Sequence, residues 1–268
     1  MWLWRFVLHI MIITSWNVNS VRARVENIKE YLQKFSPDVV MMQEIKTQDE
    51  TFPYDDFSGL DYESHVFGQK SYNGVAIISK HKLENVRLDL IKDKLKQSRI
   101  ISAELKHKKK DIQLINIYTP NGNPVDTEKY AYKKEWLDSL IKQLKSLSKK
   151  NENIILAGDF NILPSAEDAY NIKGFEDDAL YRLEIRKKYR EMINLGFHDA
   201  YRHIHGEKEG YTYWDYMRGA WQKNNGLRID HFLVSNSLLN IVKNVNINKD
   251  PRGIEKPSDH TPIEIELT

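Results

Sequence analysis

Polar residues stand directly beside short apolar runs at several points of this 268-residue chain. Asp159 and Asn161 follow the apolar residues 154–157 and a glycine. In extended chain, two residues at this spacing project to the same side, so they could share a metal ion, a water molecule or a phosphate oxygen. Taken alone, the pattern is equally typical of a buried strand followed by a helix that Asp159 caps.

Other apolar runs end in a similar way. Glu44 comes soon after a run of four apolar residues, and a charged side chain at a buried strand end is usually paired or bound to a metal. A solvated loop glutamate is the simpler alternative. Asp230 lies inside the apolar run 227–234 and should therefore have a partner. Tyr118 ends another run, just before the turn residues 119–122.

Together these residues form a set of hard oxygen ligands. The carboxylates and amides at predicted strand ends are Glu44, Asp159, Asp259, Asn17 and Asn161. This set suits Mg²⁺, with Mn²⁺ as a substitute, and does not suit a structural zinc site. His260 adds a titratable donor that Asp230 could orient. A metal, a base and several donors are the groups needed to hydrolyse a phosphodiester, whereas serine-hydrolase, Walker and dinucleotide-binding motifs are absent from the sequence.

Strands and helices that could position these residues alternate along the chain. Apolar runs predict strands at 12–16, 39–42, 75–78, 99–105, 112–118, 154–157 and 227–234, with alternation at 263–267. Helical spacing predicts a helix capped by Ser20, and further helices over 127–148 and 183–195. Several strand pairs are joined by short turns, which excludes a purely parallel sheet. We therefore expect an α/β protein with sheets packed face to face and helices outside.

Length and composition bound the class of protein. The chain is 41% hydrophobic and 29% charged and has no linker-like stretch, which favours one domain over residues 11–268. Residues 1–10 read as an upstream extension, with a natural start at Met11. The lack of cysteine excludes disulfides and fits a cytoplasmic protein. A net charge of +2 is too small to indicate nucleic-acid binding by itself, and no segment of the sequence is long and apolar enough to span a membrane.

The motifs in their order resemble a known family. Its shared core is matched by Ser15-Trp16-Asn17-Val18-Asn19-Ser20, Gln43-Glu44, Gly158-Asp159-Phe160-Asn161 and Ser258-Asp259-His260. Four further segments are Asn73-Gly74-Val75-Ala76-Ile77, Tyr118-Thr119-Pro120-Asn121-Gly122, Tyr213-Trp214-Asp215-Tyr216 and Gly226-Leu227-Arg228-Ile229-Asp230. Over about Met11 to Thr268, the chain resembles the exonuclease III branch of abasic-site endonucleases, within the endonuclease–exonuclease–phosphatase superfamily.

This resemblance implies a DNase I-like fold, a four-layer α/β sandwich of two mixed β-sheets with helices outside. It implies an Mg²⁺-dependent enzyme of DNA base-excision repair that cleaves duplex DNA 5′ to abasic sites. The same resemblance implies 3′→5′ exonuclease and 3′-phosphatase activities on 3′ ends. We expect a monomer that acts on DNA and not on membranes.

The resemblance also assigns roles at the centre of the site. Glu44 is the principal metal ligand, with help from Asn17 and Asp259. Asp159 activates or orients the attacking water, and Asn161 lies beside it; both become ligands if two metals act. The remaining catalytic residues are His260, Asp230 and Tyr118. His260 contacts the phosphate at the metal site and is oriented by Asp230. Tyr118 faces the phosphate or the leaving group.

Contacts to DNA follow from the same resemblance. Asn121 is expected to contact DNA, and Tyr213, Trp214 and Leu227 are expected to form the pocket for the abasic sugar. Side chains alternate across a strand, so at least one of the two aromatic residues is expected to belong to the core instead.

Two other functions compete with DNA repair. One is a phosphohydrolase of the same superfamily that acts on RNA or on a small phosphate ester. The other is a nucleic-acid-binding protein without catalysis, against which the intact set of polar residues argues. The segment from Tyr213 to Asp230 favours DNA, because it matches the repair branch and not only the shared core.

Overall fold

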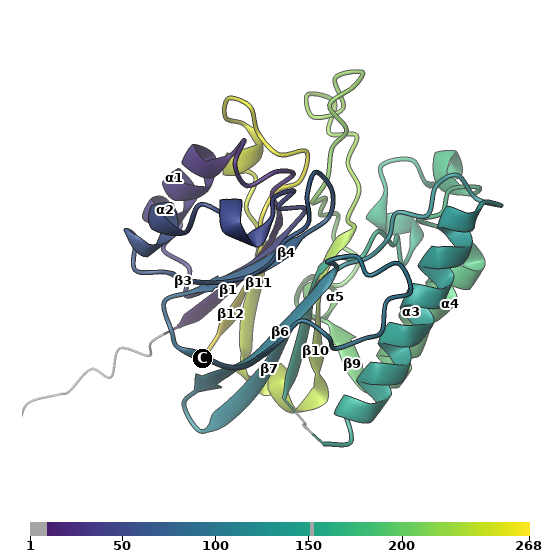
Figure 1. The fold of residues 1–268 in the computed structure, drawn as a ribbon. Coiled ribbons are helices and arrows are strands. Elements are labelled where there is room, and N and C mark those ends of the chain that lie inside the picture. The colour runs from purple at the N-terminus through teal and green to yellow at the C-terminus, as the bar shows by residue number, and fades with distance from the viewer. Residues whose placement is uncertain (1–9, 151–152) are drawn as a thin grey trace, which may run out of the picture.

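Two six-stranded sheets form the centre of the computed structural model, which describes residues 10–150 and 153–268 (Figure 1). The first sheet has the order β11 (Val242–Ile247), β12 (Ile263–Leu267), β1 (Met11–Asn17), β2 (Val39–Gln43), β4 (Val75–Ser79) and β3 (Glu63–Phe67). The second has the order β5 (Leu83–Arg87), β6 (Ile100–His107), β7 (Lys110–Tyr118), β8 (Ile154–Asp159), β10 (Asp230–Ser235) and β9 (Phe197–Asp199). Both sheets are mixed, because β1 runs parallel to β2 and β7 runs parallel to β8. The expected extension falls almost entirely on residues 1–9, which lie outside the described residues.

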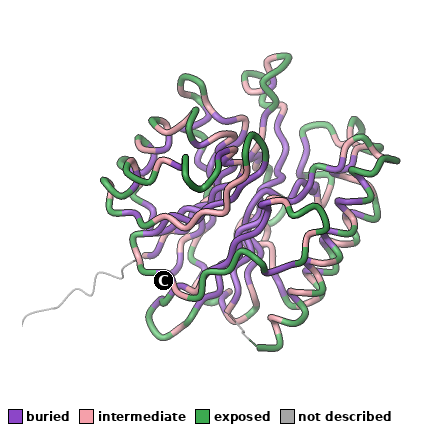
Figure 2. The backbone as a smooth tube through the Cα atoms, viewed as in Figure 1, coloured by how far each residue is buried: buried purple, intermediate pink, exposed green. Residues whose placement is uncertain are grey.

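Helices cover the outer faces of the two sheets (Figure 1). The five α-helices among the described residues are α1 (Val25–Phe35), α2 (Tyr54–Ser58), α3 (Glu128–Leu147), α4 (Leu183–Asn194) and α5 (Ala200–His205). The first two lie against the first sheet, and α3 and α4 lie against the second. Buried residues run along the strands between these layers (Figure 2). The predicted four-layer α/β sandwich is confirmed.

The apolar core between the sheets contains residues from both of them, including Ile13, Met41, Ile77, Leu114 and Phe232. Strand β8 is buried along its whole length, as its continuous apolar sequence predicts for a central strand. Gly158 has a φ of 142°, and a Cβ there would lie 1.9 Å from the carbonyl oxygen of Ile117 on β7. Only glycine therefore allows the close approach of β7 and β8 just before Asp159.

Two predicted boundaries were wrong. The first helix is not capped by Ser20 but begins at Val25. Ser20 has a φ of 87° and donates its backbone N–H to the Glu44 carbonyl, so the chain still follows the end of β2 at this point. The strand predicted to begin at Leu227 begins at Asp230, because Leu227 forms β-bridges with Ala169 and Tyr213 instead.

Candidate active site

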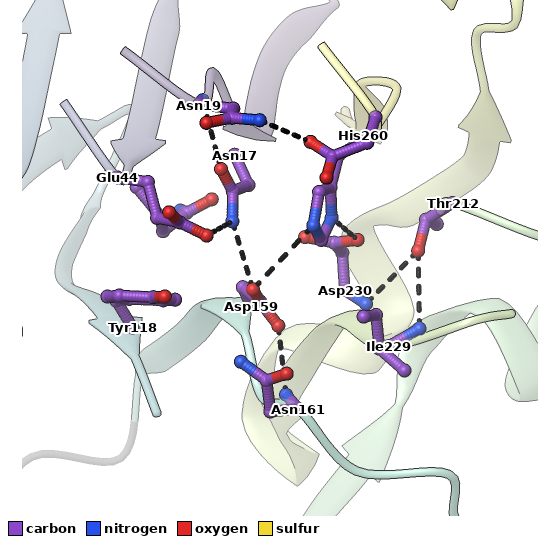
Figure 3. A network of polar contacts seen from close by, with 12 residues as sticks. Asn17, Asn19, Glu44, Tyr118, Asp159, Asn161, Thr212, Ile229, Asp230 and His260 are labelled. Atoms are coloured by element: carbon purple, nitrogen blue, oxygen red, sulfur yellow. Dashed lines mark hydrogen bonds and ion pairs between the residues drawn. The ribbon is translucent and has the colours of Figure 1, made fainter. Parts of the chain in front are cut away.

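The predicted polar residues meet at one rim of the sandwich (Figure 3). They come from strand ends or the loops beside them, namely Asn17 on β1, Glu44 after β2, Tyr118 on β7, Asp159 on β8, Asp230 on β10 and His260 before β12. Parallel strands end at the same edge of a sheet, so β1 with β2 and β7 with β8 bring residues far apart in sequence together. Glu44, Asp159 and His260 offer ligand atoms that all lie within 4.8 Å of one another.

The amide of Asn17 links the two carboxylates of this group. Its Nδ2 donates to Glu44 Oε1 at 2.9 Å and to Asp159 Oδ2 at 3.0 Å. Its Oδ1 accepts the backbone N–H of Asn19 at 3.1 Å, which fixes the orientation of the amide because a backbone nitrogen can only donate. Asn17 therefore presents its donors to both carboxylates, and its role as an oxygen ligand of the metal stays a prediction.

Glu44 is held by a cation that sequence reasoning missed. Lys46 Nζ lies 2.8 Å from Glu44 Oε2 and donates to Asn19 Oδ1. Burial alone would raise the pKa of Glu44, but the charge of Lys46 and the hydrogen bond from Asn17 outweigh burial and lower this pKa. Glu44 is therefore ionised and available to a cation at neutral pH. Its spacing of two residues from Lys46 is the one sequence signal for this pair.

Asp159 and His260 face each other in a buried site. His260 Nδ1 lies 2.8 Å from Asp230 Oδ2, and its Nε2 lies 3.9 Å from Asp159 Oδ2. Burial alone would lower the pKa of His260, but the charges of Asp230 and Asp159 and the hydrogen bond to Asp230 raise it. Burial raises the pKa of Asp159, which His260 opposes. His260 therefore keeps its proton, and Asp159 is poised to accept one.

The backbone of Asp230 is fixed by a residue outside the predicted set. Thr212 Oγ1 accepts the N–H groups of Ile229 and Asp230, both at 3.2 Å (Figure 3). This contact anchors the start of β10, which carries the partner of His260. No pattern around Thr212 in the sequence predicts the contact, because it joins a loop to a strand 18 residues further along.

Asn161 lies beside Asp159 and is almost fully buried. Its backbone N–H donates to Asp159 Oδ1 at 2.9 Å, and its Nδ2 donates to the Thr119 carbonyl at 3.0 Å. Asn121 in turn donates from Nδ2 to Asn161 Oδ1 at 3.1 Å. The amides of Asn121 and Asn161 are thus held side by side next to Asp159, as their expected places in the site require.

Tyr118 lies on the wall of the site with a cation behind it. The Arg99 guanidinium stacks over its ring at 4.7 Å and donates to the Tyr118 carbonyl at 3.1 Å. Burial raises the pKa of the phenol, and the charges of Glu44 and Asp159 raise it further. The hydroxyl therefore stays protonated and can donate a hydrogen bond. Arg99 begins the predicted strand 99–105, but nothing in that position indicates a contact with Tyr118.

A cavity of about 650 Å³ adjoins these groups. Part of its lining is apolar and comes from Tyr170, Phe175, Leu180, Tyr213, Met217, Leu227 and Ile229. The ring of Tyr213 lies 4.9 Å from the ring of His260, and Leu227 accepts the Tyr213 N–H. The polar part of the lining includes Asn121 and Asp259.

Two predicted site residues lie outside the central group. Trp214 is fully buried and packs at 4.8 Å against the Trp221 ring, so the expectation that it lines the pocket was wrong. Tyr213 is the aromatic residue of the pair that faces the cavity. Asp259 lines the cavity, but its Oδ1 accepts from Asn19 Nδ2 at 2.9 Å, and it is not among the three grouped ligands of the described chain.

An ion-pair network lies beneath the segment that carries Leu227. The fully buried Arg228 donates to Asp168 Oδ1 at 2.7 Å and to Asp199 Oδ2 at 2.9 Å. It also lies 2.9 Å from His231 Nδ1, while His231 Nε2 donates to the Ile162 carbonyl at 3.0 Å. Burial and the Arg228 charge lower the pKa of His231 to about 4. His231 is therefore neutral in the folded protein over most of the physiological pH range.

This neutral histidine predicts sensitivity to acid. A histidine in the unfolded chain binds a proton near pH 6.5, whereas His231 in the folded protein stays neutral down to about pH 4. Because only the unfolded chain binds this proton between these pH values, the free energy of unfolding falls as the pH falls through this range. Between pH 7.5 and 5.0 wild type should lose about 2 kcal/mol of unfolding free energy relative to His231→Gln. Urea unfolding of both proteins at both pH values measures this difference. The titration of the other groups is common to wild type and variant, so its contribution cancels. An unchanged difference would show that His231 is not held neutral.

The fold and the rim define a metal-dependent hydrolase of phosphate esters, because carboxylates, donors and a protonated histidine meet beside an open cavity. The chain belongs to the Endonuclease/Exonuclease/phosphatase family, whose model matches residues 14–260. It is therefore an enzyme of a family of hydrolases. Among the described residues, no helix has the length and apolar character that crossing a membrane requires.

Comparison with individual proteins gives the same family. Exodeoxyribonuclease III of Haemophilus influenzae is 34% identical over 262 residues, which cover 93% of this chain and 97% of that protein. A 3′ phosphatase from Neisseria bound to a product DNA hairpin superposes with a TM-score of 0.90 at 31% identity, covering 96% of this chain and 99% of that one. An AP endonuclease from Archaeoglobus fulgidus superposes with a TM-score of 0.89 at 32% identity, with the same coverage.

Proposed function

We propose that this chain is a DNA repair nuclease that cleaves duplex DNA 5′ to abasic sites and also acts on 3′ ends as an exonuclease and phosphatase. The observation that carries this proposal is the group of Glu44, Asp159 and His260, which lies within 4.8 Å at the edge of a partly apolar cavity. Tyr213 and Leu227 in the lining of this cavity are the proposed contacts of the abasic sugar. The similarity to DNA-processing enzymes supports DNA as the substrate.

Mg²⁺ is the proposed cofactor, with Mn²⁺ as a substitute. The donor set fits such an ion, because Glu44 is ionised and the nearby carboxylates of Asp159 and Asp259 supply further hard oxygens. When bound, the ion would supply charge to a phosphate oxygen and to the attacking water.

Each residue of the site has a proposed role in the reaction. Asp159 orients the attacking water and accepts its proton. The backbone N–H of Asn161 donates to Asp159 Oδ1 and holds that carboxylate in place. His260, held by Asp230, donates to a phosphate oxygen and stabilises the charge that develops there. Tyr118 donates from its neutral hydroxyl to the phosphate or to the leaving group. Tyr213 and Leu227 contact the abasic sugar.

The proposed protein is a monomer in which residues 11–268 act as one catalytic domain. The single domain is supported by an apolar core that extends from Met11 at the start of β1 to Leu267 at the end of β12 and includes both sheets. DNA is the only macromolecular partner proposed.

One assay tests the proposed function directly. Duplex DNA with a single abasic site and a 5′ label is expected to be cleaved 5′ to that site in Mg²⁺, and not in EDTA. An intact duplex, a duplex with a 3′-phosphate, an RNA hairpin of the same length and a small phosphate ester serve as parallel substrates. If only the RNA or a small phosphate ester is hydrolysed, the chain is a different phosphohydrolase of the same family. Cleavage that persists in EDTA would contradict metal dependence.

A further inference from the structure

A fully buried lysine lies beneath the cavity. Lys133 on α3 has no solvent exposure, and its ammonium donates to the backbone carbonyls of Asn161 at 2.6 Å, Asn121 at 3.0 Å and Ala179 at 3.1 Å. An ammonium group has three N–H donors, so these three carbonyls satisfy all of them. Burial lowers the pKa of Lys133 to about 7 against the opposing charges of Asp159 and Asp178, and the three carbonyls compensate the buried charge of the protonated form.

The three carbonyls belong to three separate segments of the cavity wall. Asn121 and Asn161 line the cavity with their side chains, and Ala179 directly precedes Leu180, which also lines it. The three segments do not belong to a common strand or helix, since they follow β7, follow β8 and precede α4. The ammonium is therefore one point at which all three loops meet.

The chain makes room for this side chain. Gly122 has a φ of 88°, and a Cβ there would lie 2.6 Å from Cδ of Lys133. A glycine next to Asn121 thus lets the loop close over the lysine stem. Asn123 joins two of the same segments from the other side, because it accepts the Ala179 N–H at 3.1 Å and donates to Asp178 Oδ1 at 3.0 Å.

We propose that Lys133 is a positioning residue for the reaction, because its ammonium sets the relative places of Asn121, Asn161 and Leu180 in the wall of the cavity. This inference rests on the proposed function of the same site. Lys133 does not touch the substrate, since its atoms are covered by the segments that it joins. It acts on the reaction through the carbonyl of Asn161, two residues from Asp159.

Lys133→Met tests this role, since methionine keeps the apolar stem and removes all three donors. A displacement of about 1 Å at a reacting group can cost ~10²-fold in rate. We therefore expect single-turnover cleavage of abasic duplex to fall about 30- to 100-fold, while duplex affinity in Ca²⁺ stays within about threefold. A role in stability alone would lower the active fraction and affect both readouts equally.

Two matched variants separate position from stability. Leu144→Ala removes core packing near the other end of α3 and should lower the melting temperature while leaving the rate per folded molecule unchanged. Lys134→Met removes the neighbouring, solvent-accessible charge and should change neither quantity. If Lys133→Met does not fold, Lys133→Arg takes its place, because its larger planar group keeps the charge but cannot place three donors in the same way.

The outcomes are distinct. The positioning role is supported if Lys133→Met, or Lys133→Arg in its place, loses rate while the two control variants do not. The rates are compared at temperatures where each protein is fully folded. A wild-type rate in the folded Lys133 variant overturns it, whatever the melting temperature. If wild type itself fails to cleave the abasic duplex in Mg²⁺, the proposed function fails instead. In that case the same variants are measured on whichever parallel substrate wild type hydrolyses.

Discussion

Asp159→Asn is expected to slow single-turnover cleavage of an abasic duplex by ~10²–10⁴, which corresponds to about 3–5 kcal/mol in the barrier. Asparagine keeps the size of the side chain and its ability to accept from the Asn161 N–H, but it cannot take a proton from water. DNA affinity, measured in Ca²⁺, should be retained or increase, because one anion that faces the phosphates is removed. The loss should therefore appear in the chemical step and not in binding.

The same variant separates catalysis from helix capping. Asparagine caps helices about as well as aspartate, so a structural role for Asp159 predicts almost normal cleavage. Asp199→Asn is a matched control, because Asp199 is also a carboxylate with little exposure but pairs with Arg228 away from the rim. That control should lower stability and leave the rate per folded molecule unchanged. Near-normal cleavage by Asp159→Asn would contradict the proposed mechanism.

Glu44→Gln is expected to raise the Mg²⁺ concentration needed for half-maximal cleavage by at least about tenfold. Substitution of a residue that only contacts a metal ligand typically lowers metal affinity 10- to 100-fold, and loss of a ligand itself should lower it at least as much. Glutamine still accepts from Asn17 and has the same length, so the thermal unfolding of the metal-free protein should shift little. Cleavage rates over a Mg²⁺ titration and melting curves in EDTA measure the two effects.

Glu264→Gln is the matched control for Glu44→Gln. Glu264 lies on β12 of the same sheet, and its carboxylate accepts from Tyr31 and Asn248 and not from the residues of the rim. Its substitution should leave the Mg²⁺ dependence unchanged. Equal Mg²⁺ curves for wild type and Glu44→Gln would remove Glu44 from the proposed ligand set.

The central strands of both sheets were predictable, and the edge strands were not. Strands such as β2 and β8 are buried on both faces, so their sequences are largely continuous apolar runs. The four strands without a prediction, β3, β5, β9 and β11, are the edges of the two sheets. An edge strand leaves one side to solvent, as the mostly exposed β5 shows, and therefore lacks an apolar run that could identify it.

The types of the site residues and their places beside strand ends were determined by the sequence alone. Glu44, Asp159 and His260 each stand beside an apolar run, and burial of such a run brings its end to the rim of a sheet. The local sequence pattern is enough to place these strand ends, because the hydrophobic period shows where each strand begins and ends. The metal chemistry follows from the oxygen ligands and the family from the order of the motifs.

Orientation and partners were decided only by the tertiary structure. Asn17 turns its donors toward Asp159, a residue 142 positions away, because the nearby N–H of Asn19 takes its oxygen. Tyr213 faces the cavity while Trp214 is buried, although neighbouring aromatic residues look alike in sequence. Lys133 belongs to a helix whose other lysines are mostly solvent-exposed, and only the convergence of three loops makes it different. Such contacts join segments whose separation is set by packing, so no local sequence pattern encodes them.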